Sequence, residues 1–185
     1  MLEDVLIAGE APADEAAILA LNEEAFGPGR FSRAAERVRE MAGGHDPTLS
    51  FAAWRGDELL GSVRMTPVAF ACRDAASGSS APDRPDRVAG HLLGPLAVRP
   101  HAKTRGIGGA LIARACVAAS DAGGRFVLLV GDEPYYGRHG FARISGPVMP
   151  RPVDPARLLV RWYGDPEPIA GPPCPWPRRS RTIRP

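Results

Sequence analysis

Apolar residues follow first a strand pattern and then a helix pattern near the start of the chain. The run Val5-Leu6-Ile7-Ala8 predicts a short strand. Apolar positions at helical spacing over 17–25, after the acidic residues Asp14 and Glu15, predict a helix, which the breaker sequence Gly27-Pro28-Gly29 ends. The same spacing over 31–38 predicts a second helix before Gly43-Gly44. This part of the chain therefore predicts a strand and two helices.

The next segment predicts a β-hairpin. Two β-like runs, 49–55 and 58–65, flank the short turn Gly56-Asp57. Residues 72–88 are polar and rich in residues that break regular structure. They predict either a mobile connection or a loop on the substrate side.

A strand, a loop, a helix and a second strand follow one another between 88 and 130. The first strand, 88–98, contains Pro95, which cannot donate a ladder hydrogen bond, so we expect a bulge or a splay there. A glycine-rich turn then leads into an alanine-rich helix over 106–122. The apolar run 126–130 predicts the next strand, which completes the unit.

Prolines dominate the C-terminal end of the chain. The elements predicted before them are a short helix at 134–138, a strand that begins at Phe141 and a strand at 157–163. The prolines that recur from Pro166 to Pro177 are incompatible with a regular helix or a central strand. We therefore expect one domain over 1–163 and a proline-rich, extended or disordered tail over 164–185.

Composition narrows the class of protein. The chain has 185 residues, of which 44% are apolar and 24% charged, as is typical of one globular domain. Its three cysteines lie far apart and form no metal-ligand pattern, so we expect a reducing, cytoplasmic location and no metal. We assign no chemistry to Cys116, which lies in an alanine-rich run. The sequence shows neither a signal peptide nor a membrane-spanning run, which favours a soluble protein.

The net charge of +2 is unevenly distributed. Residues 151–185 contain seven Arg and three acidic residues, so the rest of the chain is nearly neutral. A basic tail can contact nucleic acid, but this one has no dense Lys/Arg block, and the chain has no nucleic-acid-binding motif. We therefore expect no nucleic-acid partner, and nucleic-acid binding ranks last among the alternative functions.

The loop before the alanine-rich helix has the features of an anion site. Gly106, Gly108 and Gly109 permit close backbone approach, and the first N–H groups of a helix have no intrahelical partner. Lys103 and Arg105 add positive charge. The pattern is neither a P-loop nor a dinucleotide-binding fingerprint. The alternative is that the glycines only let the helix pack closely on the sheet.

Residues 103–108, Lys-Thr-Arg-Gly-Ile-Gly, resemble the Gln/Arg-x-x-Gly-x-Gly/Ala motif of the GNAT acetyltransferase superfamily. The first position departs from the motif, because Lys103 has the charge of arginine without its planar donors. Upstream, Leu96-Ala97-Val98 is similar to the family's splayed strand, whose backbone hydrogen-bonds the pantetheine arm of acetyl-CoA. Downstream, Tyr136-Gly-Arg-His-Gly-Phe141 is similar to the family's Tyr-x-x-x-Gly-Phe signature. The stretch 131–141 particularly resembles the bacterial YhbS-like branch.

The resemblance implies a mixed α/β (α+β) fold, with a mostly antiparallel central sheet, a splayed pair of strands and helices on both faces. It implies an N-acetyltransferase in which a primary amine attacks the thioester of acetyl-CoA directly. Tyr136 would be the general acid for the departing thiolate, and a backbone N–H of Leu96 or Val98 would polarise the carbonyl. The implied cofactor-binding residues are Leu96, Ala97, Val98, Lys103, Thr104, Arg105, Gly106, Ile107, Gly108 and Gly109.

Several assignments stay open at this point. His91, Asp132, Glu133 and His139 lie close to the motifs, but none is singled out as a general base, and water could relay the proton. Tyr136 could instead have a packing role or bond to the cofactor structurally. A CoA-binding regulatory module without catalysis is the alternative function. The acceptor, a small molecule or a peptide, and the oligomeric state, including a homodimer, also stay open.

Overall fold

The computed structural model describes residues 4–27, 34–72, 87–103 and 105–176. Its strands are β1 (Leu6–Gly9), β2 (Phe51–Arg55), β3 (Glu58–Cys72), β4 (Arg87–Val98), β5 (Phe126–Val130), β6 (Ala142–Arg143), β7 (Leu158–Trp162) and β8 (Ile169–Pro175). Its α-helices are α1 (Glu15–Phe26), α2 (Ala34–Met41), α3 (Ile107–Asp121) and α4 (Glu133–Tyr136). Short 3-10 helices are η1 (Pro12–Asp14), η3 (Pro47–Leu49), η4 (Pro100–Ala102), η5 (Gly137–His139) and η6 (Pro155–Arg157). The loop expected at 72–88 lies almost wholly outside the described residues, as does Thr104.

The eight strands form one sheet in the order β1-β2-β3-β4-β5-β7-β6, with β8 pairing to β3. The pairing of β4 with β5 is parallel, and the other described pairings are antiparallel. The predicted hairpin is present as β2 and β3, and β3 extends well beyond the predicted strand, to Cys72. The expectation of a mixed, mostly antiparallel sheet is therefore confirmed.

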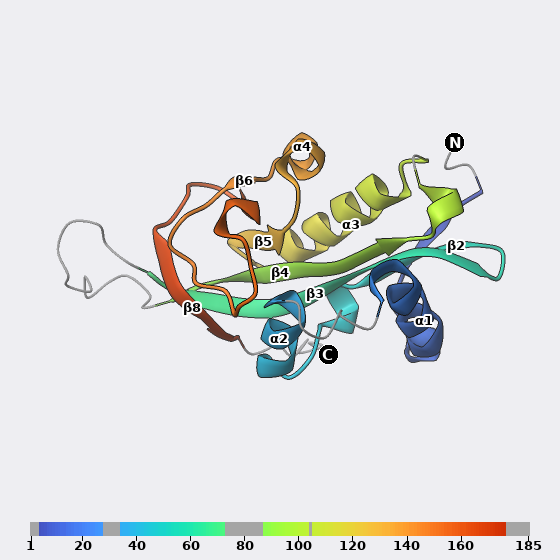
Figure 1. Cartoon of the computed structure of the whole chain (residues 1–185), viewed down its shortest axis with the longest axis horizontal. Helices are drawn as coiled ribbons and strands as arrows, with labels where there is room; N and C mark the ends of the chain where they lie inside the picture. The colour runs from blue at the N-terminus through green and yellow to red at the C-terminus, as the bar shows by residue number, and fades with distance from the viewer. Residues whose placement is uncertain (1–3, 28–33, 73–86, 104, 177–185) are drawn as a thin grey trace, which may run out of the picture.

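Helices cover both faces of this sheet, as Figure 1 shows. The helix α3 lies along one face, with α4 on the same side, while α1 and α2 lie on the opposite face. The strands β3 and β4 form the long centre of the layer between them. This three-layer arrangement leaves two separate apolar surfaces of the sheet to be buried.

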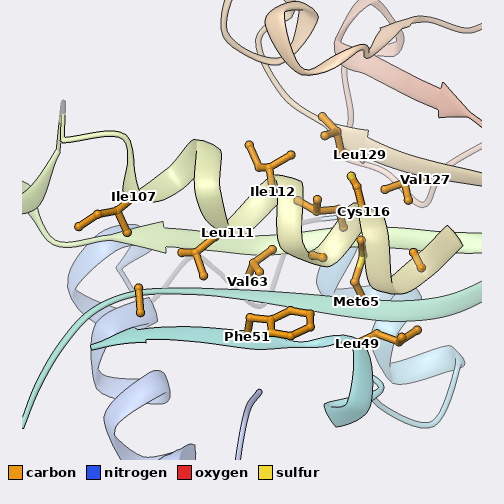
Figure 2. Close-up of a cluster of buried hydrophobic side chains, with 14 of the residues drawn as sticks. Leu49, Phe51, Val63, Met65, Ile107, Leu111, Ile112, Cys116, Val127 and Leu129 are labelled. Atoms are coloured by element: carbon orange, nitrogen blue, oxygen red, sulfur yellow. The ribbon is translucent and has the colours of Figure 1, made fainter. Parts of the chain in front are cut away.

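The helix α3 buries an apolar stripe on the sheet. Ile107, Leu111 and Ile112 are at most 1% exposed, and they recur at the spacing that places side chains on one helix face. Figure 2 shows Leu111 directed towards Val63 of β3, whereas Ile112 lies on the side of the helix near Leu129 of β5. Fully burying one such side chain stabilises the fold by about 1.5–3 kcal/mol. This packing fixes where the helix begins.

The helices α1 and α2 bury the other face. Ile18 and Leu21 of α1 pack against β2, β3 and β4, and both are 0% exposed. Ala34 and Val38 of α2 pack against β4 and β5. The helix α1 ends at Phe26, as the breaker sequence predicted, because Gly27 has a φ of 66° that stops the helical ladder.

The strand β8 corrects the domain boundary expected at residue 163. Residues 169–175 pair antiparallel with the second half of β3, on the edge whose first half is occupied by β2. Ile169 is 3% exposed and belongs to the apolar cluster under α2. A strand with one ladder partner tolerates prolines, because N–H groups that face away from that partner form no ladder bond. The boundary therefore falls too early, and the sheet continues to Pro175.

His91 lies in the middle of the sheet, where β4 pairs with both β3 and β5. The residue is 7% exposed, and its Nδ1 has no hydrogen-bond partner among the described residues. A Cβ on Gly124 would lie 2.7 Å from that nitrogen, so the ring is closely enclosed. Burial lowers the pKa of His91 to about 4, against a smaller opposing influence of Asp46.

We predict that His91 makes the folded protein acid-sensitive. The unfolded chain protonates this residue near its ordinary pKa of 6.5, whereas the folded pKa is about 4. Its contribution is therefore complete above pH 6.5 and is lost as the pH falls towards 4, by about 2 kcal/mol at pH 5. Urea unfolding at pH 7 and pH 5 measures this loss, and His91→Gln should reduce it by that amount. An equal loss in the variant would contradict the prediction.

Candidate active site

The strands β4 and β5 diverge shortly after they begin to pair. They pair at two positions, His91 with Val127 and Leu92 with Leu128. Beyond these pairs β4 continues along β3 to Val98, while β5 stays with β7 on its other side. The predicted splay is therefore present, and it leaves a wedge-shaped opening between the ends of the two parallel strands.

A β-bulge on β4 coincides with the point of parting. In the register with β3, Leu93 pairs with Met65 and Leu96 pairs with Val63. Gly94 and Pro95 consequently lie opposite one residue of β3, Arg64, which defines the bulge expected from the proline.

The bulge is held from outside the sheet by α2. Gly94 has a φ of 139°, a conformation that residues with a side chain rarely adopt. Its carbonyl oxygen accepts a hydrogen bond of 2.6 Å from Nη2 of Arg39, whose Nη1 bonds to Glu36. Arg64, opposite the bulge, is itself paired with Glu10 and Glu15. The buried Arg39 thus stabilises the distorted backbone.

Beyond the bulge, the backbone groups of successive β4 residues point alternately towards β3 and towards the opening. Arg99 donates its N–H to the carbonyl of Leu60, so it faces β3. Because N–H and C=O groups alternate between the two sides of a strand, Ala97 also faces β3, whereas Leu96 and Val98 face the opening. These two residues can therefore offer backbone hydrogen bonds to a ligand lying between the strands.

The N-terminus of α3 meets the same opening. Gly106 is the N-cap, with a φ of 83° and no side chain to cap the helix. Its carbonyl accepts the first helical bond, from Ala110 at 3.0 Å. The N–H groups of Ile107, Gly108 and Gly109 precede that bond and are not used by the helical ladder. Together with the helix dipole they form a site suited to an anion.

The side chains around this helix start take different directions. Ile107 is 1% exposed and belongs to the core, so its backbone alone faces the opening. Lys103 and Arg105 are exposed beside the helix start, where their charges favour an anion. A Cβ on Gly108 would lie 3.7 Å from Val98, so the helix start packs against the end of β4.

Two consecutive tyrosines of α4 lie on different sides of the opening. The Tyr135 hydroxyl lies 2.6 Å from where a Cβ on Gly108 would be, so it covers the helix start. Tyr136 lines the cavity described below and packs edge-on against Tyr135 and Phe141, with ring centroids 4.9 and 6.0 Å away. A Cβ on Gly131, just after β5, would lie 2.2 Å from the Tyr136 ring.

Burial raises the pKa of Tyr136 to about 12, and the nearby Tyr135 and Asp132 act in the same direction. The hydroxyl therefore keeps its proton at neutral pH. It is available as a hydrogen-bond donor, and as a general acid where negative charge develops on a leaving group beside it.

A cavity of about 810 Å³ opens from the bulge towards α1 and α2. Its walls come from α1, α2, the bulge, the end of β5, Tyr136 and residues 151–154. The wall also contains buried polar residues that were not predicted from the sequence, namely Asn22, Arg39 and Arg64. A signal was present for Asn22, because it lies four residues after Ile18 and so falls on the buried face of α1.

The four residues considered as a general base are not gathered at one point. His91 does not line the cavity. Asp132 lines it, but Asp132 and Glu133 are each paired with an exposed arginine, at 3.1 and 2.7 Å. His139 packs edge-on against the Tyr135 ring, away from the cavity wall. Burial and nearby arginines lower its pKa.

We predict that the Tyr136 ring makes Gly131 irreplaceable. Gly131→Ala should lower the free energy of unfolding by about 1–3 kcal/mol, because the added methyl group overlaps the ring. Gly137→Ala is the matched control: it has nothing within 4 Å and a φ of −57°, so it should be neutral or slightly stabilising. Urea unfolding of the two variants distinguishes these outcomes. Equal stabilities would show that the ring moves freely.

The described residues contain no group of three or more His, Cys, Asp or Glu side chains arranged to hold a metal ion. Their helices are too short or too polar to cross a membrane.

The sequence and the fold were compared with known proteins. A model of the acetyltransferase (GNAT) family matches residues 16–144. A search of curated protein sequences finds no significant match.

Solved structures give three informative neighbours. A GNAT family acetyltransferase from Brucella melitensis, in complex with acetyl-CoA, has a TM-score of 0.62 and 28% identity over 92% of this chain and 94% of that one. YhbS from Escherichia coli, in complex with CoA, has a TM-score of 0.69 and 20% identity over 94% and 90% of the two chains. Naa50 from Arabidopsis thaliana, with the bisubstrate analogue CoA-Ac-MVNAL, has a TM-score of 0.56 and 15% identity over 86% and 99%. The last two likenesses concern the fold alone.

Proposed function

The chain belongs to the GNAT acetyltransferase family, and we propose that it transfers the acetyl group of acetyl-CoA directly to a primary amine. The observation that supports this most is the opening between β4 and β5, which combines unpaired strand backbone with a helix start suited to an anion. Solved neighbours of similar fold carry acetyl-CoA or CoA.

The cosubstrate would lie in the opening. Its pyrophosphate would accept hydrogen bonds from the N–H groups of Ile107, Gly108 and Gly109, with Lys103 and Arg105 adding charge. Thr104 belongs to the same proposed loop but lies outside the described residues. The pantetheine arm would run along β4, where Leu96 and Val98 face the opening and Ala97 maintains the pairing with β3. Tyr135 would close over the phosphate end.

The reaction needs a neutral amine, a polarised carbonyl and a proton for the leaving sulfur. The amine nitrogen would attack the thioester carbon, the C–N bond would form, and the C–S bond would break. The N–H of Leu96 or Val98 would donate to the carbonyl oxygen as negative charge develops there. Tyr136 would give its proton to the departing thiolate, and the proton lost by the amine would pass through water to restore the Tyr136 hydroxyl. Holding both reactants in one cavity supplies the orientation that the step requires.

We place this activity in the cytoplasm and expect no nucleic-acid partner. The cysteines Cys72, Cys116 and Cys174 are all free, which fits a reducing compartment. Cys116 is buried in α3, and burial raises its thiol pKa, so we assign it a packing role.

We predict that acetyl-CoA and CoA raise the melting temperature, whereas NAD and ATP do not. A ligand at a hundredfold excess over its Kd stabilises the native state by about 2.7 kcal/mol, which is several degrees for a chain of this size. Differential scanning fluorimetry measures the shift. A shift with ATP alone would overturn the cosubstrate assignment.

A variant pair tests where this ligand lies. Gly108→Ala displaces Tyr135 and should reduce the acetyl-CoA shift, while Gly108→Asp adds a negative charge to the anion site and should abolish it. Both folded variants must first be shown to unfold cooperatively without ligand. Wild-type affinity in Gly108→Asp would place the phosphate elsewhere.

We predict that Tyr136→Phe lowers turnover by about a hundredfold to ten-thousandfold, the usual contribution of a general acid. The ring still packs against Gly131 and Phe141, so acetyl-CoA affinity should stay close to that of the wild type. Single-turnover acetyl transfer separates the chemical step from product release. A wild-type single-turnover rate in the variant would show that Tyr136 is not the acid.

A further inference from the structure

The wall of the cavity contains polar atoms that the described chain leaves without partners. Asn22 is 4% exposed and its Oδ1 receives no hydrogen bond, while Arg39 is 8% exposed and its Nε has no acceptor. Both residues line the same cavity. Buried polar atoms in folded proteins are nearly always paired, because an unpaired one is costly. One missing donor and one missing acceptor in the same wall indicate a ligand that supplies both.

The carboxylates of the wall are already engaged. Glu36 accepts from Nη1 of Arg39 at 2.6 Å, Asp132 lies 3.1 Å from Arg157, and Asp154 accepts from the backbone N–H of Ala156 at 2.9 Å. Among the described residues, Asp154 alone of these three forms no ion pair, so a polycationic acceptor, such as a polyamine, would meet a single carboxylate without a cationic partner in this wall.

One arginine of the wall has no carboxylate partner. The charged residues of the wall are four arginines and three carboxylates, namely Arg39, Arg64, Arg151, Arg157, Glu36, Asp132 and Asp154. Three of these arginines form ion pairs: Arg39 with Glu36, Arg64 with Glu10 and Glu15, and Arg157 with Asp132. Within the part of the chain that the structure describes, no carboxylate forms an ion pair with Arg151. Arg151 lies at the exposed rim, where an anionic group can reach it.

We propose that this cavity selects a primary amine that also carries a carboxylate, as an amino acid does. This inference rests on the proposed acetyl transfer and names the class of its acceptor. The amine would donate to Oδ1 of Asn22, and the carboxylate would accept from Nε of Arg39 and from Arg151. Leu19, Phe26 and Val130 in the same wall favour an apolar side chain on the acceptor.

A neutral amide suits the amine end of such a site. A carboxylate beside the amine would stabilise its charged ammonium form, which cannot attack the thioester. The Asn22 amide accepts a hydrogen bond without imposing that penalty. The arginines at the other end bind the carboxylate without contributing a negative charge near the nucleophile.

The first test compares acceptors that differ at the carboxylate alone. Amino acids with apolar side chains and their carboxamides, together with spermidine, are incubated with acetyl-CoA while free thiol is detected. Because an amino-acid amide has a less basic amine, more of it is neutral at a given pH, so chemistry by itself favours the amide. A preference of about tenfold or more in kcat/KM for an acid over its amide therefore supports the inference.

The second test removes one partner at a time. Arg151→Gln should raise KM for the preferred amino acid and lower the acid-to-amide ratio. Asn22→Leu should raise the melting temperature, because it removes an unpaired buried oxygen, and should lower kcat/KM for the acceptor. Thr66→Val is the matched control: Thr66 also has a buried unpaired oxygen but lies outside the cavity wall. It should raise the melting temperature without loss of turnover.

The outcomes separate the two proposals. If acetyl-CoA does not stabilise the protein and no amine is acetylated, the proposed function itself fails. If acetyl-CoA stabilises the protein but amides or spermidine are acetylated as well as the acids, or no acid in the panel is, the inference about the acceptor fails alone. An unchanged acid-to-amide ratio in Arg151→Gln, or full acceptor turnover in Asn22→Leu, also overturns it.

Discussion

The parting of β4 from β5 is the constraint on which the rest of the site depends. Two parallel strands that stayed paired would use their backbone groups on each other and leave nothing for a ligand. Here the pairing stops after Leu92, and the bulge at Gly94 and Pro95 turns the end of β4 away. The distorted backbone is stabilised by α2, because Arg39 donates a hydrogen bond to the Gly94 carbonyl. Backbone that is unpaired towards a cavity is thus maintained by a buried side chain.

The helix α3 adds the second half of the arrangement through its packing. Its buried stripe, which includes Leu111 and Ile112, fixes the helix on β3 and β4, so its N-terminus is delivered to the end of β4. The glycines there serve close approach, since Tyr135 and Val98 both come near Gly108. The same α4 turn that brings Tyr135 to this helix start aims Tyr136 into the cavity. In this region the packing of the core therefore also determines the geometry of the site.

Local sequence was sufficient to predict the opening in which we propose that the cosubstrate lies. The strand with Pro95, the glycine loop and the tyrosine motif lie within one continuous stretch, so their order along the chain predicts their proximity in space. Two features could not be predicted in this way. The strand β8 contains Pro172 and Pro173, which argue against a strand unless the edge position is known. The contact of Arg39 with Gly94 joins residues 55 positions apart, and no local pattern marks either as the partner of the other.

This division between local and distant contacts bears on how specificity is built. The proposed cosubstrate site uses backbone groups, which residues of many types can offer. It is confined to one strand, one loop and one helix. The proposed acceptor site uses side chains from α1, α2 and 151–154, three segments that meet only when the sheet and its helices are assembled. Asn22 and Arg39 each keep one unpaired polar atom there, at a cost in stability that an acceptor supplying the missing partners would remove. We expect unpaired side-chain atoms in the acceptor site if these side chains recognise the acceptor. The proposed cosubstrate site needs none, because backbone groups bind its ligand.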